Sequence, residues 1–276
     1  MAVVLALLGA IAYGVSDFIG GLTARRTTLW PVAVLACTGA LLGTLVLAVA
    51  VPGDPHAGDL VWGLVAGVGS GAGTTFLYRG LAAGRMGVVA PVSAVGATVI
   101  PVLLGFATGE RPSFLVWIGI AAALPGIWLV SREVPDPGAA AMSGLLDGIL
   151  AGVGFGVLFA ALGQVPASAG YWPVVANQAA SVTAVVVAAY LLGASPIPTR
   201  RGEWWGLVSG VLAAVAVLAF LLATHRGLLS VSAVLTSLYP AVTVLLAAVV
   251  LKEHVHRVQA AGLALCAAAI VLVATG

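Results

Sequence analysis

The sequence has very few charged residues. Lys, Arg, Asp and Glu together make up 7% of its 276 positions, whereas a soluble globular domain carries roughly 25%. This scarcity excludes an ordinary soluble protein, whose surface must be covered by such residues. Hydrophobic residues make up 62% of the chain, and they indicate an integral membrane protein surrounded by lipid.

Several kinds of site are excluded by what is missing. The two cysteines, Cys37 and Cys266, lie in apolar runs without a His or Cys at metal-ligand spacing, so we expect packing residues and no metal site. A net charge of +2, without a basic block longer than an Arg pair, excludes a nucleic-acid partner. The stretch GVGSGAG at residues 67–73 lacks the glycine spacing and the strand of a dinucleotide-binding loop. We expect no cofactor and no use of ATP.

The sequence does contain a series of long apolar segments. Each has about 20 apolar residues, the length of a membrane-spanning helix, and none alternates as a barrel strand does. Because a helix satisfies its own backbone hydrogen bonds in lipid, we predict an all-α integral membrane protein with ten transmembrane helices. The predicted segments lie near residues 2–23, 31–51, 60–82, 87–107, 113–131, 144–163, 172–192, 204–224, 228–250 and 257–275.

The ten segments form two related sets of five. WGLVAGV at residues 62–68 returns as WGLVSGV at residues 205–211, and the same offset along the chain, which we call the repeat offset, relates Glu110 to Glu253. An odd number of spans in each repeat means that the second copy crosses the membrane in the opposite direction, so the repeats are inverted. We expect a first five-helix repeat at 1–131, a linker at 132–143 and a second five-helix repeat at 144–276.

The end of each repeat carries a family resemblance. GLLSVSAVLTSLYPAVTVLLAAVVLKE at residues 227–253 has small residues, a proline within the helix, an apolar run and a closing Glu, and residues 84–110 follow this pattern with prolines at other positions. With its two five-helix repeats, the chain resembles the EamA-like family of the drug/metabolite transporter superfamily. The resemblance implies alternating access at the interface of the repeats. It also implies a small organic solute, such as a metabolite, an amino acid or a drug, that is often exported.

An alternative from another class is a membrane-embedded hydrolase with Ser70 as nucleophile and His225 as base. The spacing of a nucleophile elbow is missing, and the inverted repeat favours transport, so we do not expect an enzyme. The expected partners are a small-molecule solute, the lipid bilayer and, for a coupled transporter, protons. The chain is expected to be a monomer or a weak dimer.

The basic residues are distributed unevenly between the two membrane faces. Counting spans places two of the eleven Lys and Arg residues, Arg111 and Arg226, on the face of the N-terminus and the other nine on the opposite face. The positive-inside rule then predicts a multi-pass cell-membrane protein with both termini outside the cytoplasm. The family resemblance implies an N-inside arrangement instead, and the sequence leaves both open.

Asp17 is a carboxylic acid inside the first apolar segment. It lies eight residues before Arg25, about 12 Å from that end of the helix at 1.5 Å per residue. An acid near the bilayer centre costs roughly 2.5–3.5 kcal/mol on insertion scales, so it should face protein or a watery cavity. Arg79 lies at a similar depth, and we predict that it pairs with Asp17 directly or through water. The pair is either a structural link between two helices or a site for substrate binding or proton coupling.

Polar residues at helical spacing predict faces that line a cavity, although Ser and Thr also join helices by ordinary hydrogen bonds. Pro91, Pro101 and Pro240 are expected to interrupt their helices and to act as gating hinges or as tolerated bends. The predicted substrate-binding or coupling residues are Asp17, Tyr13, Ser16, Arg79, Ser70, Thr74, Tyr78, Asn177, Ser232, Thr236 and Tyr239.

Two further patterns concern helix surfaces and helix ends. Gly63, Gly67 and Gly71 recur at every fourth position and predict a thin face of the third helix against which a neighbour packs closely. Glu110 and Glu253 lie at segment ends beside basic residues, and we expect solvated ion pairs at the membrane interface, with a gate as the alternative.

Overall fold

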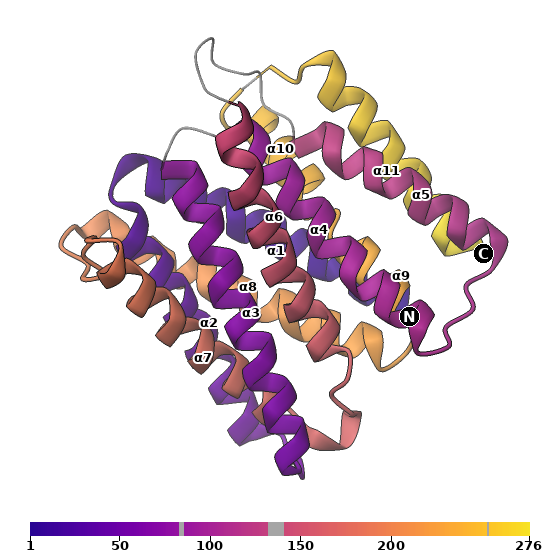
Figure 1. Ribbon diagram of the computed structural model, residues 1–276, viewed down its shortest axis with the longest axis horizontal. Helices are drawn as coiled ribbons and strands as arrows, with labels where there is room; N and C mark the ends of the chain where they lie inside the picture. Colours follow the sequence, from indigo (N-terminus) through magenta and orange to yellow (C-terminus); the bar gives the residue numbers. More distant parts are fainter. Residues whose placement is uncertain (83–85, 132–140, 253) are drawn as a thin grey trace.

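The computed structural model describes residues 1–82, 86–131, 141–252 and 254–276, and within these ranges every element is helical (Figure 1). The α-helices of the first half are α1 (Ala2–Arg26), α2 (Leu29–Ala50), α3 (Ala57–Ala82), α4 (Met86–Ala107) and α5 (Phe114–Ser131). Those of the second half are α6 (Ala141–Leu162), α7 (Trp172–Leu191), α8 (Trp205–Thr224), α9 (Leu229–Thr236), α10 (Tyr239–Val250) and α11 (Arg257–Thr275). Short 3-10 helices, η1 (Ala167–Ala169) and η2 (Arg201–Trp204), precede α7 and α8.

Ten segments of the described chain are long and apolar enough to cross a membrane, with α9 and α10 forming one span. The predicted all-α, ten-span fold is therefore confirmed. The start of α3 differs from the predicted position for a local reason. α3 begins before the predicted apolar run because the Asp59 carboxylate accepts the backbone N–H of His56 at 2.9 Å and so caps the helix.

The ninth span is broken in its middle. α9 ends at Thr236 and α10 begins at Tyr239, and Pro240, which has no backbone N–H, lies in the first turn of α10. In contrast, α4 continues through both Pro91 and Pro101. The expectation of an interruption is right for Pro240 and wrong for the other two. A helix packed among others tolerates a proline because its neighbours support the turns on either side.

The main helix contacts between the two halves have counterparts in which the equivalent helices have changed places. α1 packs on α8 as α6 packs on α3, and α2 packs on α8 as α7 packs on α3. α4 packs on α6 as α9 and α10 pack on α1, while α2 meets α7 and α5 meets α11. Both chain ends lie on the same side of the bundle in Figure 1, as an even number of spans requires. We call this the terminal side and the other the opposite side.

Glycines bring α3 and α8 into backbone contact with their neighbours. A Cβ atom at Gly63 would lie 2.1 Å from the carbonyl oxygen of Pro173 in α7, and one at Gly210 would lie 2.0 Å from that of Ala36 in α2. No side chain fits at such distances. The predicted thin face of the third helix is confirmed, since Gly67 also lies against the α7 backbone. Gly67 and Gly210 are equivalent by the repeat offset.

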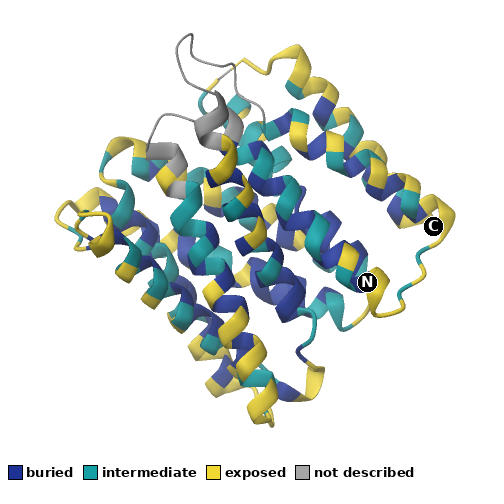
Figure 2. Ribbon diagram, in the orientation of Figure 1, coloured by how far each residue is buried: buried dark blue, intermediate teal, exposed yellow. Residues whose placement is uncertain are grey.

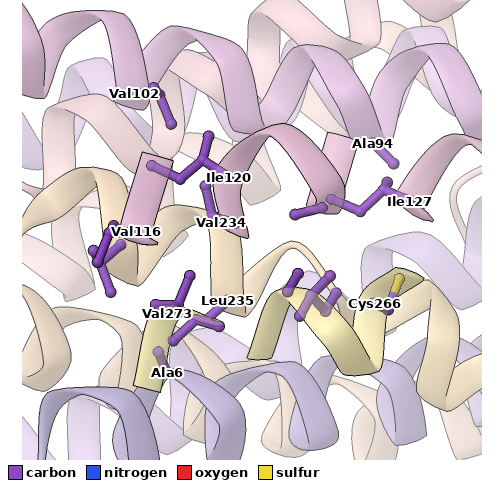
Figure 3. Close-up of a cluster of buried hydrophobic side chains, with 14 of the residues drawn as sticks. Ala6, Ala94, Val102, Val116, Ile120, Ile127, Val234, Leu235, Cys266 and Val273 are labelled. Carbon is purple, nitrogen blue, oxygen red and sulfur yellow. The ribbon is translucent and has the colours of Figure 1, made fainter. Parts of the chain in front are cut away.

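Two buried apolar clusters hold the bundle together. The first lies where α5 and α11 meet α1, α4 and α9, and it includes Ile120, Leu235 and Cys266 (Figure 3). The second surrounds Phe159 and Phe220. The outward faces carry many exposed large apolar side chains (Figure 2), which suits a surface in contact with lipid rather than water.

Candidate functional site

A cavity of about 170 Å³ lies in the middle of the bundle, between helices of both halves. The polar side chains around it are those of Tyr13, Ser16, Asp17, Cys37, Ser70, Thr74, Asn177, Gln178, Ser181, Ser209 and Tyr239. Seven of these were predicted from the sequence: Tyr13, Ser16, Asp17, Ser70, Thr74, Asn177 and Tyr239. The structure brings these seven together around one space, and their roles there remain predictions.

Asp17 is the only charged residue among the described residues that line this cavity. It lies well inside α1, yet its side chain is exposed, because it borders the open space. Tyr13 and Tyr239 line the same cavity as the Asp17 carboxyl. A charge in a membrane helix is thus kept in a cavity and away from lipid, as expected for an intramembrane acid.

Aromatic rings form the wall beside Asp17. The ring centroids of Tyr13 and Tyr239 are 5.9 Å apart, and Phe159 meets Tyr13 edge-on at 6.3 Å. Tyr13 precedes Asp17 by one helical turn, so its ring and the carboxylate share a face of α1. Tyr239 reaches the cavity because the break before α10 turns this residue toward α1.

Small polar groups from α2, α3 and α7 also line the cavity. The hydroxyl of Ser181 donates to that of Ser70 at 3.2 Å, and Cys37 Sγ lies 3.8 Å from the Ser181 oxygen. Asn177 is 1% exposed, and neither its amide oxygen nor its amide nitrogen has a hydrogen-bond partner among the described residues. Because a buried amide without partners is costly, Asn177 is suited to bind something that occupies the cavity.

Ser16 has a structural role as well as a place in the lining. Its hydroxyl donates to the backbone oxygen of Ser209 at 2.8 Å, and the Ser209 hydroxyl donates to the backbone oxygen of Ser16 at 2.9 Å. The two hydroxyl oxygens are 3.0 Å apart. This reciprocal contact joins α1 to α8, so Ser16 already has its hydrogen-bond partners without any ligand.

The cavity extends toward the opposite side of the bundle. Ala33, Leu77 and Ser209 line it and lie four or five residues from the ends of their helices on that side. At 1.5 Å per residue, this is about 6–8 Å along the helix axis. The cavity therefore reaches to within about 6–8 Å of the opposite end of the bundle.

Toward the terminal side the cavity is closed by packed apolar side chains. Phe159 and Phe220 lie with ring centroids 4.7 Å apart, and they pack in the buried cluster with Leu162, Val165 and Leu229. We call these five residues the terminal-side seal. All lie near the ends of α6 and α8, in the loop after α6 or at the start of α9.

Polar contacts support the terminal-side seal. The Glu110 carboxylate accepts the backbone N–H groups of Leu229 at 2.5 Å and Ser230 at 3.1 Å, and so caps α9. His225 Nε2 lies 2.8 Å from the carbonyl oxygen of Val165. The expectation that Glu110 is merely a solvated interfacial charge is therefore wrong, and Glu253 lies outside the described residues.

The predicted pairing of Arg79 with Asp17 is wrong. Arg79 Nε and Nη2 donate to Asp147 Oδ1 of α6 at 2.8 and 2.5 Å, and the guanidinium also lies over the ring of Phe76. Arg79 lies on the side of α3 that meets α6, and it is not part of the cavity lining. Asp147 stands within the sixth apolar segment, so the reasoning that identified Asp17 would have found it too.

Two predicted residues of the ninth span do not line the cavity. Ser232 and Thr236 are fully buried, and the Thr236 hydroxyl donates to the backbone oxygen of Ala6 at 3.3 Å. The prediction assumed one continuous helical face from Ser232 to Tyr239. The break after Thr236 ends that face, so only Tyr239 reaches the cavity. The side chain of Tyr78 lies outside the described part of the structure.

Sequence reasoning missed several lining residues. Cys37 was expected to be a packing residue, and Gln178, Ser209, Phe155 and Phe159 were not identified. Ser209 stands in the second Trp-Gly motif, where the first repeat has Ala66. This difference between the repeats could have identified Ser209 as a lining residue. No sequence feature could have identified the two phenylalanines, because an aromatic residue in an apolar run has no distinctive pattern.

The residues of the hydrolase alternative are not brought together. The contact of the Ser70 hydroxyl is with Ser181, whereas His225 lies against Val165 at the terminal end of α8. A nucleophile must lie within hydrogen-bond reach of its base. Ser70 and His225 do not form such a pair. The described residues also contain no group of three His, Cys, Asp or Glu side chains that could hold a metal ion.

Comparisons with known proteins agree with this architecture. A comparison with curated proteins finds no match. A crystal structure of a protein superposes with a TM-score of 0.78 at 16% sequence identity, over 99% of this chain and 98% of that chain, which shows a shared fold. The family model described as the EamA-like transporter family matches residues 1–132 and again residues 140–275. The chain belongs to the EamA-like transporter family.

Proposed function

We propose that the protein is a secondary transporter that moves a small organic solute by alternating access, with the cavity as its binding site in one of two end states. Membership in the family supplies the coarser part of this statement, since the chain is a membrane transporter of small solutes. The observation that carries the rest is the cavity itself. It lies between helices of both halves, is sealed toward the terminal side and extends toward the other.

The proposed moving parts are two five-helix repeats, residues 1–131 and 144–276, joined by the linker 132–143. Each repeat has an odd number of spans, so two similar repeats must run in opposite directions through the membrane. The exchange of packing pairs between the halves supports this inverted relation. In such an arrangement the second end state arises when the two halves exchange conformations.

The repeat offset identifies the seal expected in the second end state. Phe159 and Phe220 are equivalent to Ser16 and Leu77, both of which line the cavity. We therefore expect Ser16 and Leu77 to approach each other when Phe159 and Phe220 separate. The cavity would then open toward the terminal side.

The proposed net direction is export, and it depends on orientation. If both termini lie outside the cell, as the distribution of basic residues predicts, the opposite side is cytoplasmic and the cavity takes up solute from the cytoplasm. A reporter that is active only in the cytoplasm, fused after Gly276, would then be silent. Strong activity of this reporter would indicate the reverse orientation, in which the cavity extends toward the outside of the cell.

Solute counterflow in proteoliposomes tests the transport proposal. Purified protein is reconstituted into vesicles that contain one unlabelled metabolite from a panel, and uptake of the same labelled metabolite is followed. We expect transient accumulation for the solute that is transported and none in protein-free vesicles. A hydrolase would instead release product without exchange. Repeating the assay across pH with wild type and Asp17→Asn shows whether a proton moves with the solute.

A further inference from the structure

We propose that the solute is a small organic cation, such as a protonated amine or a quaternary ammonium, held by the Asp17 carboxylate within an aromatic wall. This inference rests on the proposed transport function and names the class of solute that the same cavity takes.

The first observation is the charge of the cavity. Asp17 is the one acidic residue of the described lining, which includes no Lys or Arg. Arg79, the basic residue expected beside it, is held by Asp147 instead. A solute that fills the cavity displaces water from the carboxylate, and this loss of hydration is costly unless an opposite charge accompanies it. A cationic solute would supply that charge at the moment when it fills the cavity.

The second observation is the aromatic wall. Tyr13 and Tyr239 lie 5.9 Å apart, and Phe159 stands edge-on to Tyr13. The face of an aromatic ring attracts a cation, and the attraction increases when the cation is desolvated. Because Tyr13 and Asp17 are one helical turn apart, a single ammonium group is able to contact a ring and the carboxylate together.

The third observation concerns size and a second polar contact. The cavity of about 170 Å³ is smaller than the roughly 300–1,000 Å³ typical of pockets for drug-sized ligands. Asn177 offers an unpaired buried amide in the same lining. The expected solute is therefore small, with its charge at Asp17 and one further hydrogen-bonding group for Asn177.

Other solute classes fit these observations less well. An anion would be repelled by Asp17. A free amino acid carries a carboxylate that needs a cationic partner, and none of the described lining residues supplies one. A neutral solute would displace water from the Asp17 carboxyl without supplying an opposite charge.

Binding of matched probes to the purified full-length protein tests the inference without any mutation. Choline is compared by isothermal titration calorimetry with 3,3-dimethylbutan-1-ol, which has the same shape without charge, and with betaine, which adds a carboxylate. Phenethylamine, 2-phenylethanol and phenylacetate form a second series. We expect the cation of at least one series to bind tenfold or more tightly than its neutral and carboxylate counterparts. Equal or tighter binding of a neutral or carboxylate probe overturns the inference, and so does failure of both cations to bind.

A variant assigns the preference to Asp17. We expect Asp17→Asn to lose at least tenfold in cation affinity while its affinity for the neutral probe is unchanged. The control is Asp59→Asn, which removes an identical charge at the terminal end of α3 and should bind both probes as wild type does. A cation preference that persists in a folded Asp17→Asn protein contradicts the role of this residue.

Failure of this inference is distinguishable from failure of the transport proposal. Counterflow of a neutral or anionic solute would overturn the charge preference and leave transport intact. Tight cation binding without exchange of any solute would retain the binding site and count against transport.

Discussion

The terminal side and the opposite side of the bundle differ in where their helices contact one another. On the terminal side the contacts are central: Phe159 packs on Phe220, and Glu110 caps α9 directly beside them. On the opposite side, two described polar contacts lie near the helix ends, among residues that do not line the cavity, and we call them the rim contacts. The buried Glu203 carboxylate accepts the backbone N–H of Arg200 and the hydroxyl of Thr28, while Arg79 bonds Asp147.

The two repeats supply unequal residues for closing the two sides of the cavity. By the repeat offset, the pair Phe159 and Phe220 corresponds to the pair Ser16 and Leu77. Two phenylalanines in contact bury far more apolar surface than a serine and a leucine do. Although the two halves use the same helix pairs, the proposed alternation would close the terminal side more strongly than the opposite side. We therefore expect the unliganded protein to rest with its terminal side shut.

The largest expected effect comes from fixing the terminal-side seal. In a background without Cys37 and Cys266, Phe159→Cys and Phe220→Cys are joined by a short reducible thiol crosslinker. Alternating access requires these positions to separate, so we expect complete loss of counterflow and recovery after reduction. The uncrosslinked double variant is the control and must transport. Undiminished transport by fully crosslinked protein would remove the distinction between a sealed and an open side.

The next effect concerns the rim of the opposite side. Arg79→Leu should destabilise the protein by about 1.5–3 kcal/mol, because it removes the charge-assisted hydrogen bonds that Arg79 donates to the buried Asp147 carboxylate. Asp147→Asn should cost less. The Arg79 side chain is 42% exposed against 5% for Asp147, so an unpaired arginine is still able to reach water. Denaturant unfolding in detergent measures both, and equal losses would show that Asp147 is not desolvated as the structure indicates.

The sequence predicted the frame of the molecule because lipid imposes a simple rule on it. A segment of apolar residues long enough to cross a bilayer must be helical, so the ten spans could be located to within a few residues. Gly63 and Gly67 likewise predicted a close helix contact from their spacing alone. The composition of a run therefore predicts a helix, and the spacing within the run predicts its thin face.

The site was only partly predictable, because a sequence does not show which side of a helix meets which neighbour. Arg79 and Asp17 lie at similar depths, but Arg79 turns toward α6 and Asp147. Ser232 and Thr236 were placed on a face that stops where the helix breaks before Pro240. Depth along a helix follows from counting residues, whereas rotation about its axis depends on packing partners in the other half of the chain.

A smaller effect tests the contact between α2 and α8. Gly210→Ala places a methyl group 2.0 Å from the Ala36 carbonyl oxygen, so the helices must move apart at a cost of about 1–3 kcal/mol. Gly21→Ala is the matched control, since nothing lies within 4 Å of its new methyl group and alanine favours a helix by up to about 1 kcal/mol. Thermal unfolding should therefore show opposite shifts. Shifts of the same sign would contradict the backbone contact.

The smallest effect concerns the support of the terminal-side seal by Glu110. Its two carboxylate oxygens accept the N–H groups of Leu229 and Ser230, at the positive end of the α9 dipole. Glu110→Gln keeps one acceptor oxygen and nearly the same shape but removes the charge and the second acceptor. The loss should be about 1 kcal/mol, which is a factor of about five in the local opening equilibrium.

Hydrogen exchange of the α9 amide groups measures this opening. We expect exchange at Leu229 and Ser230 to be about fivefold faster in Glu110→Gln, while the rim contacts around Glu203 are unchanged. Asp59→Asn, which alters a cap at the start of α3, should leave α9 exchange as in wild type. If the charge of Glu110 matters only through solvation, α9 exchange will be the same in Glu110→Gln and Asp59→Asn. Faster exchange confined to α9 would instead show that the strength of the terminal-side seal depends on a cap that α9 receives from the first half of the chain.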